Sequence, residues 1–201
     1  MKKLLSVLLV IVMLCSIGAM GVSAASTSSN LSSLLQSMKF DPNTIKYCAY
    51  LNDTNRVAGA GHSAIMLIDA KGNGCYFSFY SKWGTPYGPG IMDRKTLAFI
   101  AVADFFKNGI MAQNDTYNRF IKFPVTATEG KAMYSYAQEV HEKNSFMYSV
   151  TGWQCDNVVQ RVMKAGNKKY EYSITGTPNT SFNNVKKNLD RNGISYTVYT
   201  V

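Results

Sequence analysis

The feature that most constrains the fold is an apolar run, a tight turn and a second apolar run. The run HSAIMLID spans residues 62–69, KGNG covers 71–74, and CYFSFY covers 75–80. A compact apolar run of this length is typical of a buried strand, and Asn-Gly favours a tight reversal between antiparallel strands. We therefore expect a β-hairpin whose first strand begins at His62.

The remaining pattern predicts further strands and four helices around this hairpin. Strands are expected at residues 45–51, 117–125 and 194–201, and residues 81–93, rich in Gly, Pro and aromatics, are expected to form a loop. Helices are expected over residues 94–107, from 126 or 128 to 143, from Cys155 to a cap at Gly166, and over 181–192. Thr126 and Glu129 have the spacing of a capping box. This order predicts an α+β fold with an antiparallel sheet packed by helices.

The N-terminus has the organisation of a secretory signal peptide. Lys2 and Lys3 precede a mainly apolar run, and Val22-Ser23-Ala24 offers small residues for cleavage. We expect a signal peptide at 1–24, a Ser-rich leader at 25–42 and one domain at 43–201, hence a secreted protein, with cell-wall association as an option. A membrane anchor is the alternative for the first segment.

The chain is basic, with 21 Lys and Arg against 12 Asp and Glu and a net charge of +9. Outside a cell, this charge favours association with anionic wall polymers or membranes, although solubility alone would also explain it. The basic residues are scattered, with no stripe interleaved with aromatics, so nucleic acid is not an expected partner. The sequence does not indicate an oligomeric state.

Three cysteines remain once Cys15 is assigned to the signal peptide: Cys48, Cys75 and Cys155. An odd number in a secreted chain indicates an intermolecular bridge or a reactive thiol. Cys48 and Cys75 lie in expected strands, where they either pair or act as small buried apolar residues. Cys155 is different, because it stands at the expected start of a helix.

Cys155 and His62 together suggest nucleophilic catalysis. Unpaired N–H groups at a helix N-terminus favour a thiolate, and an imidazole can take the thiol proton and return it to a leaving group. The only other histidine, His141, lies near the end of a charged helix and is interpreted as a surface residue. Taken singly, Cys155 and His62 are equally compatible with structural roles.

The segments GHSAIMLIDAKGNGCYFSFYS and MYSVTGWQCDNVVQRVMKAG resemble the permuted papain-like cysteine hydrolases, in the lecithin–retinol acyltransferase-like branch of the NlpC superfamily. In that group the histidine strand precedes the cysteine helix. The resemblance covers about residues 45–201. It implies a papain-like, circularly permuted fold, with Cys155 as the nucleophile and His62 as the base.

Two positions depart from the family pattern. Many relatives have Asn before the cysteine, where this chain has Gln154, and many have a polar third residue on the strand after the histidine strand. Ser78 is the best positional candidate for that orienting residue, with a backbone carbonyl as the alternative. The Cys155 backbone N–H would serve as an oxyanion donor, with Gln154 as a possible helper.

Aromatic residues flank the expected site. Trp83, Tyr87 and Trp153 are candidate substrate-binding residues, with core packing as the alternative. No metal-ligand spacing, phosphate loop or convincing carboxylate pair is present, so we expect no metal and no cofactor.

The leading hypothesis is a secreted thiol hydrolase, an amidase or peptidase, acting on peptides such as those of peptidoglycan. The alternatives are a catalytically inactive binding or structural module of the same fold, or an acyltransferase or toxin effector that uses the same acyl-enzyme.

Overall fold

The computed structural model describes residues 39–108, 110–112, 115–143 and 146–201. The expected signal peptide at 1–24 and the leader as far as residue 38 lie outside the described residues. The described residues belong to one compact unit. No helix within the described residues has the length and apolar character needed to cross a membrane.

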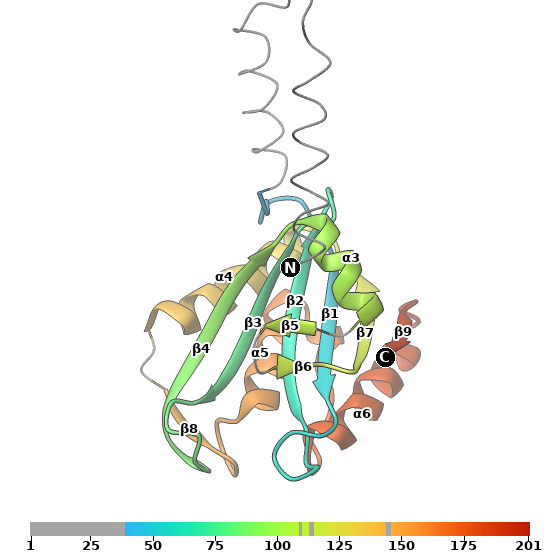
Figure 1. Ribbon diagram of the computed structural model, residues 1–201. Coiled ribbons are helices and arrows are strands. Elements are labelled where there is room, and N and C mark those ends of the chain that lie inside the picture. The colour runs from blue at the N-terminus through green and yellow to red at the C-terminus, as the bar shows by residue number, and fades with distance from the viewer. Residues whose placement is uncertain (1–38, 109, 113–114, 144–145) are drawn as a thin grey trace, which may run out of the picture. The chain divides into compact units, whose positions relative to one another are not determined.

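A seven-stranded antiparallel sheet forms the centre of this unit (Figure 1). Its order is β8-β4-β3-β2-β1-β7-β9, so the expected hairpin of β2 and β3 occupies the middle. The strands are β1 (Ile45–Asp53), β2 (His62–Asp69), β3 (Gly74–Ser81), β4 (Tyr87–Leu97), β7 (Arg119–Pro124), β8 (Met147–Ser149) and β9 (Thr197–Thr200). A separate two-stranded sheet pairs β5 (Ile110–Ala112) with β6 (Asp115–Thr116).

Helices cover both faces of the large sheet (Figure 1). On one face lie α4 (Ala127–Lys143), α5 (Cys155–Gly166), the 3₁₀ turn η1 (Lys168–Tyr170) and α6 (Pro178–Arg191). On the other lies α3 (Phe99–Asn108), which contributes Val102 and Phe105 to the core. We call these the α5 face and the α3 face.

Strand β2 is buried along its whole length because both faces are covered. Ile65 and Leu67 belong to the core cluster of the α5 face, whereas Ala64 and Met66 belong to that of the α3 face. Successive strand residues point to opposite faces. This explains why the sequence of β2 is continuously apolar and does not alternate, and it assigns each flanking polar residue to a face.

The α+β class is confirmed, whereas several predicted elements need correction. Residues 87–97 form strand β4, where a loop and the start of a helix were expected, and α3 begins only at Phe99. The apolar stripe of the helix was extended too far upstream, because residues 94–97 pair with β3. Helix α6 begins at Pro178, three residues before the expected start, because Pro is favoured in a first helical turn.

The capping box of α4 is present as expected. The Thr126 backbone N–H donates to Glu129 Oε2, and the Glu129 N–H donates to Thr126 Oγ1. His141, interpreted as a surface residue, is half-buried, and its Nδ1 is hydrogen-bonded to the Met92 carbonyl. Helix α4 therefore packs its last turn against β4, which the charge pattern of the helix did not indicate.

Cys48 and Cys75 are free, buried thiols on β1 and β3. Each pairs with Leu67 of the intervening strand β2, so two interstrand spacings, or roughly 10 Å, separate their Cα atoms. A disulfide needs Cα atoms closer than about 7 Å. The reading of both residues as small buried apolar groups fits this geometry, and the disulfide does not.

Candidate functional site

Cys155 is the first residue of α5, at the end of the sheet where β2 begins. Gln154 occupies the N-cap position with an extended backbone, and its side chain makes no capping hydrogen bond. The apolar residues Val158, Val159 and Val162 hold the helix against the sheet. The thiol is only 2 % exposed.

The Ser63 backbone N–H and the Ser63 hydroxyl favour the Cys155 thiolate and act to lower the pKa of the thiol. Burial acts more strongly in the opposite direction and raises the pKa of the thiol to about 11. The lowered pKa expected from the helix N-terminus is therefore not found, because desolvation of the thiolate outweighs the favourable N–H groups.

His62 is the first residue of β2 and is also buried. Its Nε2 lies 2.8 Å from the Oγ of Ser78 on β3, the residue expected from the sequence to orient the ring. This contact leaves Nδ1 as the ring nitrogen that Ser78 does not engage. Burial and, to a smaller extent, the nearby Arg56 guanidinium together lower the pKa of the imidazole to about 3, so the ring is neutral at pH 7.

A chain of hydroxyls continues from Ser78 beneath the α3 face. Ser78 Oγ lies 3.3 Å from the Tyr117 hydroxyl, which lies 2.8 Å from the Tyr76 hydroxyl. We call His62, Ser78, Tyr117 and Tyr76 the His62 chain. Either oxygen of each hydroxyl pair can be the donor, so the direction of the chain is not fixed by the geometry.

A second polar cluster lies on the α5 face, directly beside the thiol. Asp156 is fully buried, and its Oδ1 accepts hydrogen bonds from Tyr50 at 2.8 Å, Tyr172 at 2.8 Å and Ser63 at 3.3 Å. We call these four residues the Asp156 cluster. Burial raises the pKa of the Asp156 carboxyl. A negative charge on Asp156 also raises the pKa of the adjacent Cys155 thiol.

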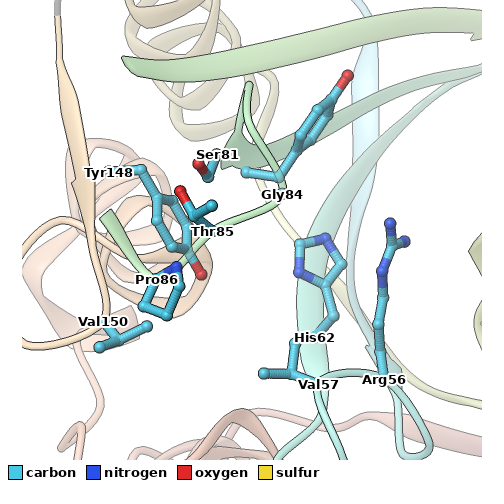
Figure 2. A pocket seen from close by; sticks show the side chains of 10 residues that line it. Arg56, Val57, His62, Ser81, Gly84, Thr85, Pro86, Tyr148 and Val150 are labelled. Atoms are coloured by element: carbon cyan, nitrogen blue, oxygen red, sulfur yellow. The ribbon is translucent and has the colours of Figure 1, made fainter. Parts of the chain in front are cut away.

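Two adjacent clefts reach these residues. The cleft beside His62 has a volume of about 350 Å³ and is lined by Arg56, Val57, His62, Tyr80, Ser81, Gly84, Thr85, Pro86, Tyr148 and Val150 (Figure 2). The cleft beside Cys155 has a volume of about 160 Å³ and includes Gln154 and Cys155. Val57, Tyr148 and Val150 line both, so one extended ligand can contact both sides of the site.

The aromatic residues expected to bind substrate have separate environments. Trp83 and Tyr87 are 66 % and 58 % exposed and flank the Gly84–Pro86 segment that lines the His62 cleft. Trp153 is half-buried, stacks on Phe146 with ring centroids 4.4 Å apart, and carries the Arg161 guanidinium on its ring. Trp153 therefore has a packing role in this structure, whereas Gln154 lies at the Cys155 cleft.

The structure adds residues that the sequence reasoning missed. Asn52 donates to the His62 carbonyl, and Asn179 of α6 donates to the carbonyls of Thr54 and Gly59 in the loop before His62. A Cβ atom at Gly61 would lie 2.4 Å from Asn179 Oδ1, which explains the glycine there. The Asn179 contacts join segments more than one hundred residues apart, so no local pattern indicates them. Only the adjacency of Asp156 to Cys155 was visible in the sequence.

Comparison with family models, with curated proteins and with solved structures found no match for this chain. Among the described residues, no group of three or more His, Cys, Asp and Glu side chains is placed to hold a metal ion.

Proposed function

We propose that this protein is a thiol-dependent acyl hydrolase of papain-like, permuted type, acting as an amidase or peptidase. One observation carries the proposal. Cys155 and His62 lie at the same end of the sheet and line two adjoining clefts that share Val57, Tyr148 and Val150, and Ser78 holds the His62 ring through Nε2. The family resemblance of the two motifs supports the same assignment.

The chemistry begins from a neutral thiol and a neutral imidazole, since burial disfavours the charged form of each. As the sulfur attacks the carbonyl carbon of the substrate, the thiol proton passes to the His62 imidazole through water in the adjoining clefts, because the ring lies on the α3 face and the thiol on the α5 face. The imidazolium then gives this proton to the departing amine, which leaves a thioester on Cys155. Water attacks the thioester with His62 again as the base, releasing the acid and restoring the thiol.

Other groups of the site assist these steps. Ser78 orients the ring by its hydrogen bond to Nε2, and the Cys155 backbone N–H at the start of α5 is available to the oxyanion. Gln154 lies at the same cleft and is the second candidate donor. Acyl transfer to an amine or alcohol would use the same thioester and differ only in the final acceptor.

The proposed substrate is a peptide outside the cell, with peptidoglycan stems or crosslinks as the natural case. The signal-like N-terminus and the net charge of +9 support this setting, because a basic protein is attracted to an anionic wall. A released toxin acting on other cells would have the same sequence features.

The test is acylation of the protein by p-nitrophenyl acetate, with the modified cysteine located by peptide mass mapping. We expect acetylation of Cys155, slowed by roughly 100-fold in His62→Gln and by less in Ser78→Ala, because general-base catalysis contributes about 10²–10⁴-fold. Cys48 and Cys75 serve as internal controls, since both are buried thiols away from His62. Acetylation of Cys155 at the same rate in His62→Gln would overturn the proposal.

A second candidate function is a binding module that keeps the fold without turnover. The observation that favours it is the protonation state of the site, since a thiol with a pKa of about 11 and an imidazole with a pKa of about 3 form no ion pair. This candidate predicts that Cys155 resists acetylation in the folded wild-type protein and reacts only when unfolded.

A further inference from the structure

The cleft beside His62 carries a single formal charge on its walls. Its ten lining residues, all within the described part of the chain, include the Arg56 guanidinium and no carboxylate. Figure 2 shows Arg56 and His62 side by side on one wall, with Tyr148, Pro86 and Val150 across the cleft. An anionic group that entered this space would meet the positive charge of Arg56, and no carboxylate of the lining would repel it.

Arg56 is electrostatically central to the cleft. Its positive charge lowers the pKa of His62 and opposes the rise in the pKa values of Tyr80 and Tyr148, which line the same space. The side chain is half-buried, so water screens its field less than that of an exposed arginine. The guanidinium also offers a planar set of donors that matches a carboxylate.

The loop that carries Arg56 is held in an unfavourable backbone conformation. Val57 and Ala58 have φ values of 55° and 52°, a region that non-glycine residues, and β-branched ones above all, rarely adopt. Asn179 fixes the loop by donating to the carbonyls on both sides of this segment. Strained backbone that the surrounding structure holds in place is characteristic of functional sites.

A buried hydroxyl on the same cleft points independently to a ligand. Ser81 is 6 % exposed and lines the cleft, and its Oγ has no hydrogen-bonding partner within the described residues. A buried hydroxyl without a partner costs about 1–3 kcal/mol unless a ligand or water satisfies it. Ser81 therefore supplies a hydroxyl donor that no acceptor among the described residues uses.

We propose that the cleft beside His62 is a subsite for a carboxylate-bearing part of the substrate, with Arg56 as its counter-ion and the Ser81 hydroxyl as a further donor. This inference rests on the proposed acyl hydrolase function and names the substrate class as an anionic peptide. The apolar side chains of Val57, Pro86 and Val150 suit a small aliphatic group next to the carboxylate. The carboxylate belongs either to a peptide C-terminus or to an acidic side chain.

The experiment is titration calorimetry on the Cys155→Ser protein, which separates binding from turnover. The probes are N-acetyl-Ala-Gly and its C-terminal amide for a terminal carboxylate, and N-acetyl-Glu-amide and N-acetyl-Gln-amide for a side-chain carboxylate. In one of the two pairs we expect the acid to bind about tenfold or more tightly than its amide, the value of one charge-assisted hydrogen-bonded contact.

The selectivity should depend on Arg56 and not on overall charge. Arg56→Gln should bring the acid and amide of that pair to equal affinity, and Arg56→Lys should restore part of the difference. Arg191→Gln, which removes an exposed charge at the end of α6, is the matched control and should leave the ratio unchanged. Ser81→Ala should weaken the acid more than the amide. Circular dichroism checks that each variant is folded.

Equal binding of acid and amide in both pairs, binding of no probe, or selectivity that survives Arg56→Gln would each overturn the carboxylate subsite. None of these outcomes bears on the acylation of Cys155 by p-nitrophenyl acetate. If that acylation fails while the Arg56-dependent selectivity is found, the cleft is a carboxylate-binding site in a protein without turnover.

Discussion

The two polar clusters at the start of β2 are built from similar parts but differ in what they can do. In the Asp156 cluster, three hydroxyls converge on one carboxylate oxygen and each must donate to it. In the His62 chain, every hydroxyl contact can run in either direction, and the imidazole can donate or accept. The first arrangement fixes the packing of α5 on β1 and β2, whereas the second leaves freedom to move a proton.

The difference also appears in the direction of the two pKa shifts. Burial raises the pKa of Asp156 and lowers that of His62, so each group is shifted toward its neutral form. A carboxyl with a raised pKa contributes stability at acid pH and loses it as pH rises. An imidazole with a lowered pKa contributes stability above its unfolded pKa and loses it as pH falls.

The largest expected effect is the loss of the Asp156 carboxylate. Asp156→Ala removes the acceptor of the Tyr50, Tyr172 and Ser63 hydroxyls, and we expect the free energy of unfolding to fall by about 3–4 kcal/mol, because buried donors are left without a partner. Urea denaturation measures this loss. Asp156→Asn is the matched control, since it keeps an acceptor oxygen and should cost less. A loss below 1 kcal/mol for Asp156→Ala would show that the cluster does not hold α5.

The next effect is the acid sensitivity due to His62. Between pH 6.5 and about 3 the unfolded state binds a proton at this position and the folded state does not. Stability should therefore fall with falling pH by up to roughly 1.4 kcal/mol per pH unit in this window. Urea titrations at several pH values should show this slope in the wild type and in His141→Gln but not in His62→Gln. An unchanged slope in His62→Gln would contradict a buried neutral ring.

The two clusters can be compared directly through one tyrosine of each. Tyr172→Phe removes a hydrogen bond to a carboxylate and should cost about 2 kcal/mol, whereas Tyr117→Phe removes contacts between neutral hydroxyls and should cost about 1 kcal/mol. Both hydroxyls belong to fully buried rings, so the apolar packing is unchanged in each variant. Equal losses in the free energy of unfolding would contradict the difference that we infer between the Asp156 cluster and the His62 chain.

The smallest effect on stability is expected for Ser78→Ala, which should lower the free energy of unfolding by about 1 kcal/mol. The relative decrease in the rate of Cys155 acylation should be larger than the relative decrease in stability. Loss of the Ser78 hydroxyl removes the hydrogen bond to Nε2, so the His62 ring is free to adopt the other tautomer. Thermal unfolding and acetylation rates on the same sample compare the two consequences. A variant that loses stability but acylates normally would make Ser78 a packing residue.

Local sequence patterns determined much of the architecture. The apolar runs on either side of KGNG identified the central hairpin, the capping residues Thr126 and Glu129 located α4, and the α+β class followed from the order of elements. These features depend on side-chain periodicity and on contacts within a few residues, which the chain carries without its fold. Strand β4 was missed because its pairing with β3 overrides the glycine and proline residues within it.

Only the tertiary structure decided the state of the site. The sequence indicated Cys155, His62 and Ser78, but burial sets their pKa values, and burial depends on how α5 and the sheet close over them. The same holds for Arg56, which looks like an ordinary loop residue until Asn179 of a distant helix fixes the loop beside His62. Residue types specify which reactions are possible, whereas desolvation and long-range contacts specify which charges the site holds.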